Sequence, residues 1–142
     1  LTRGRSPAAA RLGADVMADP PDLEGMLSSL RSASQSREIG EALLDQQLVA
    51  GIGNMWRAEA LFAARISPWR RLSELDDREL RGLLEQAARL MRSGRRRRDV
   101  YRLAGRPCRV CGARIRSHRQ GDEARTAYWC PGCQAGTGPA GA

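Results

Sequence analysis

The chain has 142 residues, which is enough for one domain or for one compact core with a small satellite module. No apolar run approaches the roughly eighteen residues of a membrane span and no targeting segment is visible, so we expect a cytoplasmic protein with no membrane partner. The net charge of +8 is uneven, because residues 89–125 carry thirteen arginines against three acids, whereas residues 1–88 carry eleven against thirteen. Such a basic region favours a phosphate-rich partner, since neutralised phosphates release their counterions.

The first predicted helix follows a segment without periodicity. Residues 1–20 are rich in Arg, Ala and Gly and are interpreted as a linker or loose arm. Pro20-Pro21-Asp22 ends that arm and begins a helix whose apolar residues recur at i, i+3, i+4 and i+7. These apolar residues are Leu23, Met26, Leu27 and Leu30. Their spacing predicts one buried face on a short helix.

Two further helices are predicted on either side of a glycine turn. The apolar pattern of residues 38–50 indicates one helix, and that of residues 55–64 indicates another. Gly51 and Gly53 lie between them and permit a turn with positive φ. Asn54 stands at the expected N-cap of the following helix. Helix, glycine turn and helix together predict a helix-turn-helix shape, which many helical bundles share.

Capping and composition give the fourth helix and the domain boundaries. Ser73-Glu-Leu-Asp76 resembles a capping box with Asp in place of Glu, and the helix that follows ends at Ser93-Gly94. The expected divisions are residues 21–94 for a helical domain, 95–107 for a basic linker, 108–134 for a metal module and 135–142 for a disordered tail. The alternative for Arg95–Arg98 is a solvated run of charge with no partner.

Two Cys-x-x-Cys pairs define the metal module. Cys108-Arg-Val-Cys111 and Cys130-Pro-Gly-Cys133 are separated by eighteen residues, which is the spacing of a four-thiolate zinc site. Each pair forms a tight turn, and a hairpin with its own turn at residues 120–123 brings the two pairs together. We expect one structural zinc ion held by Cys108, Cys111, Cys130 and Cys133, because four protein ligands leave no position for water.

Other uses of four cysteines fit the pattern less well. Two disulfides are conceivable, but no signal peptide is visible and paired Cys-x-x-Cys turns are typical of metal sites. A thioredoxin-like redox pair needs one such turn near a βαβ pattern, which this sequence lacks. His118, the only histidine, lies between the two pairs and is interpreted as a surface residue.

The order of these motifs resembles one family. Residues 44–68, with Leu44-Asp45-Gln46, Gly51-Ile52-Gly53-Asn54 and Glu59-Ala60-Leu61-Phe62, resemble the helix-two-turns-helix signature of formamidopyrimidine-DNA glycosylases and endonuclease VIII. Residues 105–134 resemble their C-terminal zinc finger. The resemblance runs from about Leu12 to Gln134 and implies a mainly α fold. In that fold a helix-two-turns-helix bundle of about four helices precedes a small four-Cys zinc-finger β-hairpin.

The resemblance implies roles for two side chains. Asn54, with Gly51 and Gly53 beside it, matches the family's contact to DNA phosphate at a helix N-terminus, a position suited to anions. From its type alone, Asn54 could instead only cap its helix. Arg125, five residues before Cys130, matches the finger arginine that grips phosphates at the lesion and is assigned to a late elimination step. Because arginine stays protonated in proteins, a clamp on the leaving phosphate is favoured over proton donation, and the alternative is a solvated arginine.

The family also implies an enzymatic activity that this sequence matches only in part. Its enzymes remove oxidised bases and cut the abasic strand, using an N-terminal proline amine, a glutamate and a lysine carried by an N-terminal β-sandwich. This sequence begins Leu1-Thr2, contains no lysine, and has no strand-rich region before its helices. We expect the DNA-binding portion of a base-excision-repair glycosylase/AP lyase, a monomer that binds damaged or abasic double-stranded DNA. Alternatives are a stand-alone zinc-dependent DNA-binding module and an RNA- or ribosome-associated zinc ribbon.

Overall fold

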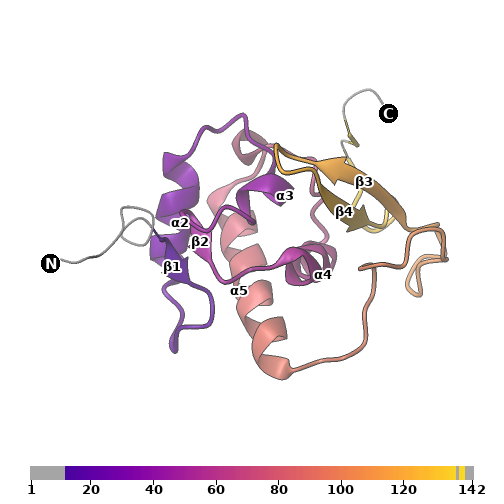
Figure 1. Cartoon of the computed structure of the whole chain (residues 1–142), viewed down its shortest axis with the longest axis horizontal. Helices are drawn as coiled ribbons and strands as arrows, with labels where there is room; N and C mark the ends of the chain where they lie inside the picture. Colours follow the sequence, from indigo (N-terminus) through magenta and orange to yellow (C-terminus); the bar gives the residue numbers. More distant parts are fainter. Residues whose placement is uncertain (1–11, 137, 140–142) are drawn as a thin grey trace, which may run out of the picture.

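The computed structural model describes residues 12–136 and 138–139. Its elements are β1 (Ala14–Asp15), α2 (Leu23–Ser32), α3 (Ile39–Ala42), β2 (Val49–Ala50), α4 (Asn54–Ala64), η1 (Leu72–Glu74), α5 (Asp77–Ser93), β3 (Arg116–Gln120) and β4 (Arg125–Trp129). The long helix α5 lies between α2 and α4 and contacts both, and the β3–β4 hairpin lies at one edge of this bundle against α4 (Figure 1). The predicted mainly α fold with a small C-terminal hairpin is confirmed, and the described residues contain no β-sandwich. No helix in this part of the chain is long and apolar enough to cross a membrane.

Helices α2 and α5 each begin at a residue whose side chain caps the helix. The Asp22 carboxylate accepts a backbone N–H from the first turn of α2 at 2.9 Å. The Asp76 carboxylate accepts the backbone N–H of Glu79 at 2.7 Å, and the Glu79 carboxylate accepts that of Asp76 at 3.0 Å. This reciprocal pair is a capping box. It begins at Asp76 and not at Ser73, so the predicted motif was placed three residues too early.

The apolar faces of the helices form one core. Leu80, Leu83 and Leu84 of α5 have no exposed surface. Burying one leucine side chain completely contributes about 1.5–3 kcal/mol to folding. The same core contains Met26, Leu27 and Leu30 of the predicted apolar face of α2, and the partly buried Leu23 packs against it. The helical periodicity therefore identified the faces that α2 and α5 turn toward each other.

The helix predicted over residues 38–50 is wrong beyond its first turn. Helix α3 has only four residues. The chain then turns at Asp45. The Asp45 side chain accepts the backbone N–H of Gln47 at 3.0 Å, and the Asp45 backbone carbonyl accepts the backbone N–H of Val49 at 3.1 Å. Aspartate competes with helical hydrogen bonds in this way. The turn allows β2 to pair in parallel with β1, with Ala14 opposite Val49.

The same pairing corrects the interpretation of residues 1–20 as a loose arm. The backbone N–H of Val16 donates to the carbonyl of Ala50 at 3.0 Å, and the Val16 side chain is fully buried in the helical core. A two-residue strand has too few positions to show a periodic pattern. The segment from Ala14 onward therefore belongs to the bundle, while residues 1–11 lie outside the described residues.

The predicted hairpin is present and is fixed to the bundle. Strands β3 and β4 are antiparallel, and the turn between them contains Gly121 at a φ of 80°. Trp69, from the loop after α4, packs edge-to-face on Trp129 of β4 with ring centroids 5.4 Å apart. Such aromatic pairs contribute about 0.5–1.5 kcal/mol beyond the area they bury. Of the tail predicted to be disordered, residues 137 and 140–142 lie outside the described residues, and Pro139 is buried.

Candidate metal centre and nucleic-acid interface

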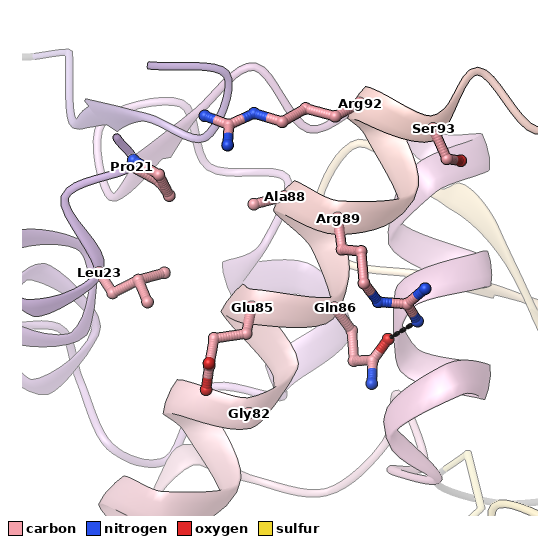
Figure 2. A pocket seen from close by; sticks show the side chains of 9 residues that line it. All are labelled: Pro21, Leu23, Gly82, Glu85, Gln86, Ala88, Arg89, Arg92 and Ser93. Carbon is pink, nitrogen blue, oxygen red and sulfur yellow. Dashed lines mark hydrogen bonds between the residues drawn. The ribbon is translucent and has the colours of Figure 1, made fainter. Parts of the chain in front are cut away.

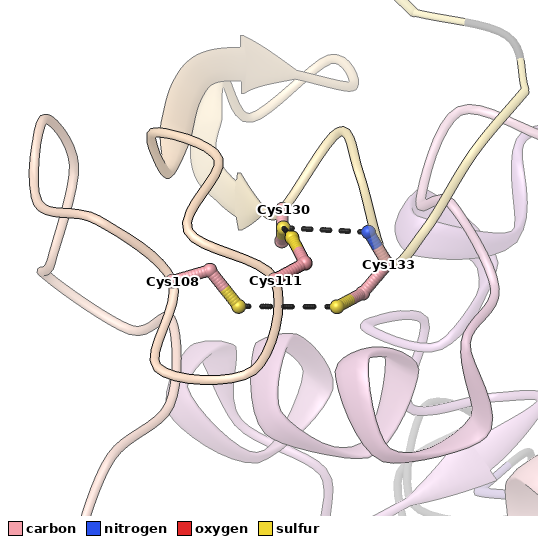
Figure 3. Close-up of side chains that lie close together, drawn as sticks. All are labelled: Cys108, Cys111, Cys130 and Cys133. Carbon is pink, nitrogen blue, oxygen red and sulfur yellow. Dashed lines mark hydrogen bonds between the residues drawn. The ribbon is translucent and has the colours of Figure 1, made fainter.

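Four cysteine sulfurs converge from two loops of the finger, residues 108–134 (Figure 3). All four Sγ atoms lie within 4.8 Å of one another. The Sγ atoms of Cys108 and Cys133 are 3.8 Å apart, and those of Cys111 and Cys130 are 3.4 Å apart. A tetrahedral zinc ion with zinc–sulfur bonds of about 2.3 Å places its sulfur ligands roughly 3.8 Å apart. The cluster therefore has the size and the donor set of a four-thiolate zinc site.

The alternatives for these cysteines do not match the geometry. All four thiols are free, and the separations exceed the roughly 2.05 Å of a disulfide. His118 is exposed, and its Nδ1 lies 2.8 Å from the carbonyl oxygen of Arg119. The histidine is not a member of the cysteine group, as expected for a surface residue.

The backbone of each turn is adapted to the sulfurs. The N–H groups of Val110 and Cys133 each donate to the sulfur of the first cysteine of their own pair at 3.4 Å. A Cβ at Gly132 would lie 2.7 Å from the Cys111 sulfur, closer than real Cβ atoms approach other atoms. Only glycine therefore leaves room for Cys111 to join the cluster.

The thiols do not ionise equally by themselves. Burial opposes ionisation of Cys108, but hydrogen bonds from the backbone of Cys111 and Val110 lower the pKa of its thiol to about 7. Burial and the neighbouring thiols raise the pKa of Cys133 to about 12. Four crowded thiolates need a cation to balance their charge, so this donor set fits a divalent metal ion.

A second cluster forms where α4 meets the hairpin. The side-chain amide of Asn54 donates to the carbonyl oxygen of Thr126 on β4 at 2.9 Å. Its carbonyl oxygen accepts from Nη2 of Arg57 at 2.6 Å, and the same Nη2 donates to the Thr126 carbonyl at 3.1 Å. The structure thus brings predicted residue Asn54 to the strand that begins with Arg125, a residue 71 positions later in the sequence.

Asn54 is not a helix cap, contrary to the simpler interpretation from sequence. Gly53 is the N-cap of α4, and no side chain caps this end. Of the two glycines expected to adopt positive φ, Gly51 does so at 100°, whereas Gly53 has a φ of −93°. A Cβ at Gly53 would meet nothing within 4 Å, so this face of the turn is open. The N–H groups that begin a helix lack intrahelical partners, which makes the open turn suited to an anion.

Arg57 lies beneath this turn and was missed in the sequence. Its side chain is 1% exposed, and Nη1 donates to Gln120 Oε1 at 2.6 Å and to the Gly40 carbonyl at 3.0 Å. Burial, and secondarily the charge of Arg125, lower the pKa of Arg57 to about 10, so it stays protonated at neutral pH. The sequence carries no local signal for this burial, because a charged residue in a helical segment normally marks the solvent face.

Glu59, two residues after Arg57 on α4, holds the segment of residues 95–101 that leads into the finger. Its carboxylate has no exposed surface and accepts the backbone N–H groups of Asp99, Val100 and Tyr101 at 2.8–3.0 Å. It also pairs with Arg95 at 3.0 Å. Residues 95–101 are therefore held against α4, which corrects their interpretation as a free basic linker.

The finger shares a small apolar core with the bundle. Val100, Ile115 and Cys130 pack with Ala58 and Phe62 of α4. The finger is thus positioned by α4 through both polar and apolar contacts.

A hollow between α2 and α5 lacks such a group of polar side chains. A cavity of about 780 Å³ lies between the start of α2 and one side of α5 (Figure 2). Its charged side chains are Glu85, Arg89 and Arg92, and Arg89 bonds to Gln86 within the same helix. No nucleophile paired with a base lines it.

Comparison with known proteins gives one consistent result. The formamidopyrimidine-DNA glycosylase H2TH domain matches residues 12–100. "Probable endonuclease 8 2" of Streptomyces coelicolor is 39% identical over 146 residues, which cover 93% of this chain and 52% of that protein. "Endonuclease 8 1" of Mycobacterium tuberculosis is 34% identical, with 88% of this chain and 54% of that protein covered.

Solved structures agree with the sequence comparison. The MutM (Fpg) protein from Thermus thermophilus superposes with a TM-score of 0.80 at 29% identity, covering 94% of this chain and 57% of that one. The Lactococcus lactis formamidopyrimidine-DNA glycosylase bound to DNA containing an AP site superposes with a TM-score of 0.77 at 25% identity, covering 89% and 51%. The chain therefore spans about half the length of the curated relatives it matches.

Proposed function

This chain belongs to the formamidopyrimidine-DNA glycosylase H2TH family, and on that premise we propose that it is the DNA-binding portion of a base-excision-repair DNA glycosylase/AP lyase. In physical terms, Asn54 and Arg125 hold phosphates of a damaged or abasic duplex, with Gly51 and Gly53 forming the open turn. One chain supplies both groups, so a monomer is sufficient. The relatives carry names of DNA glycosylases and endonucleases VIII, and one solved neighbour is bound to AP-site DNA.

One observation carries the proposal, namely two arginines at the junction of α4 and β4 that have no carboxylate of the described residues at ion-pair distance. No described carboxylate forms an ion pair with Arg57 or Arg125. Buried charges in proteins are normally paired, because an isolated ion loses its hydration. The buried charge here is Arg57, and a phosphate bound at the exposed Arg125 supplies negative charge beside both arginines.

Asn54 is pre-oriented for the same ligand. A side-chain amide has two N–H donors, and one of them is committed to the Thr126 carbonyl. The hydrogen bond from Arg57 fixes which end of the amide is the donor. The second N–H of Asn54 and the first backbone N–H groups of α4 remain to receive a phosphate oxygen.

The residue types of the site limit which chemical roles it can have. Arg125 stays charged and stabilises negative charge on a phosphate, including a leaving phosphate in strand elimination. A zinc ion held by Cys108, Cys111, Cys130 and Cys133 would stabilise the fold, because all four of its positions are taken by protein. The 142 residues contain no lysine, so an amine nucleophile is not a lysine of this sequence.

Equilibrium binding tests the proposal. The zinc-loaded chain is titrated against a fluorescein-labelled duplex carrying a tetrahydrofuran abasic analogue, and anisotropy gives Kd. Arg125→Ala is expected to weaken binding about ten- to a hundredfold, as for a charge-assisted hydrogen bond of about 1.5–3 kcal/mol. Asn54→Ala removes a neutral donor and is expected to cost about three- to tenfold.

Arg81→Ala is the matched control, because Arg81 is ion-paired with Glu24 on an exposed face formed by α5 and α2. Wild-type affinity in this variant, with weakened binding in the other two, supports the proposal. Equal losses in Arg125→Ala and Arg81→Ala would indicate only a loss of net charge, because each removes one arginine. Tighter binding of single-stranded RNA than of the duplex would favour an RNA-associated zinc ribbon instead.

A further inference from the structure

The end of β3 is fixed to the helical bundle by one side chain that the proposed function does not yet use. Gln120 is 4% exposed. Its Oε1 accepts from Arg57 at 2.6 Å, and its Nε2 donates to the Pro68 carbonyl at 2.8 Å and to Glu38 at 3.2 Å. This single amide thus joins the hairpin to α4, to the loop after α4 and to the residue before α3.

The fit around this amide is close. A Cβ at Gly40 would overlap the Gln120 side-chain oxygen, and one at Gly121 would lie 3.0 Å from the Glu41 side chain. Glycine at both positions lets the tip of the hairpin rest directly on α3. A side chain held on several sides in a buried pocket has one permitted position.

Gln120 is also the strand partner of Arg125. The two residues are opposite each other in the antiparallel register. Arg125 itself makes no ion pair in the described part of the chain and is exposed. The backbone from which Arg125 projects is therefore fixed through Gln120 on one side and, through Thr126, by Asn54 and Arg57 on the other.

We propose that Gln120 is a positioning residue that holds Arg125 at the separation from Asn54 that one stretch of DNA backbone requires. This inference rests on the proposed phosphate contacts of those two residues. Gln120 touches no DNA in this scheme, because it is buried; it acts by keeping the hairpin from pivoting on the bundle. Its removal therefore lowers DNA affinity only as far as Arg125 contributes to that affinity.

A double-mutant cycle tests this dependence with the zinc-loaded chain and the duplex carrying the tetrahydrofuran analogue. Gln120→Ala is expected to weaken binding about three- to tenfold, because Arg125 would then be misplaced for its charged hydrogen bond to a DNA phosphate. In the Arg125→Ala background the same change is expected to have less than about a twofold effect, because contacting sites that act together are not additive. Gln35→Ala is the control, since Gln35 also donates to three carbonyl groups but lies in the loop after α2.

Three outcomes overturn the inference. Wild-type affinity of a folded, zinc-loaded Gln120→Ala chain removes the positioning role. Equal effects of Gln120→Ala with and without Arg125 show a general structural role instead. If Gln120→Ala loses zinc, Glu38→Ala carries the same cycle, because it removes only the 3.2 Å contact from the bundle side. Wild-type affinity of Arg125→Ala would instead reject the phosphate contact itself, and the role of Gln120 with it.

Discussion

Arg57 and Glu59 lie two residues apart on α4, both are buried, and they bind different segments of the chain instead of each other. Residues at i and i+2 of a helix point in different directions. Arg57 therefore reaches the hairpin at Gln120, while Glu59 reaches the backbone of residues 99–101. Helix α4 thus fixes both the hairpin and the segment that precedes the finger, and presents Asn54 at its own N-terminus.

Glu59→Gln is expected to destabilise the chain. The carboxylate accepts three backbone N–H groups and the Arg95 guanidinium, and an amide would direct its own N–H groups at some of these donors. A buried group left without a partner costs about 1–3 kcal/mol, more when it is charged. Urea unfolding followed by circular dichroism measures the loss. Glu85→Gln, on an exposed position of α5, is expected to unfold like the wild type, and an equal loss there would contradict the anchoring role.

Removing the metal is expected to unfold the finger and spare the helices. A chelator, or Cys130→Ser, takes away the ion that balances four crowded thiolates, and small metal modules fold only with their metal. Helices α2 and α5 keep their separate leucine-rich core. Elemental analysis should give one zinc per wild-type chain, and far-ultraviolet circular dichroism should retain most of its helical signal after chelation. Complete loss of helical signal would show that the finger and the bundle fold as one unit.

Two glycine substitutions are expected to act in opposite directions. At Gly132 a methyl group would lie 2.7 Å from the Cys111 sulfur, so Gly132→Ala should weaken metal retention. At Gly82, inside α5, a methyl group meets nothing within 4 Å. Gly82→Ala should therefore stabilise the chain by about 0.5–1 kcal/mol, the usual gain for alanine in a helix. Competition with a chromogenic zinc chelator compares retention, and thermal unfolding compares stability; equal retention in both variants would contradict the steric role of Gly132.

Features encoded locally were predictable from the sequence. The cysteine spacing gave the four sulfurs that the structure brings together, and the helical period of α2 gave its buried face. The helix expected over residues 38–50 failed because α3 ends at Ala42, the chain turns at Asp45, and β2 pairs with residues 14–15. That pairing depends on a distant segment and has no periodic signal.

The buried charges of α4 were not predictable for the same reason. Arg57 and Glu59 stand in a helical pattern where charge normally marks the solvent face. Their burial depends on partners at residues 95–101, 120 and 126, which local patterns do not specify. The two residues that position the finger are therefore visible only in the folded chain.

The salt dependence of DNA binding should separate the two phosphate contacts. Log affinity falls linearly with log salt, with a slope of about −0.9 for each phosphate neutralised by a cation. Arg125→Ala removes one such cation and is expected to make the slope shallower by about 0.9. Asn54→Ala removes a neutral donor and is expected to lower affinity at every salt concentration with an unchanged slope.

Anisotropy titrations with the abasic-analogue duplex between about 50 and 200 mM salt cover a range in which a protein with several phosphate contacts changes affinity strongly. Arg81→Ala serves again as the control, and its slope should equal that of the wild type if Arg81 stays off the DNA. A shallower slope in Asn54→Ala would mean that Asn54 acts by positioning an arginine and not by its own contact with a phosphate. That arginine is Arg125 or Arg57, and Asn54 is hydrogen-bonded to Arg57. An unchanged slope in Arg125→Ala would exclude a direct ionic contact between this arginine and the DNA backbone.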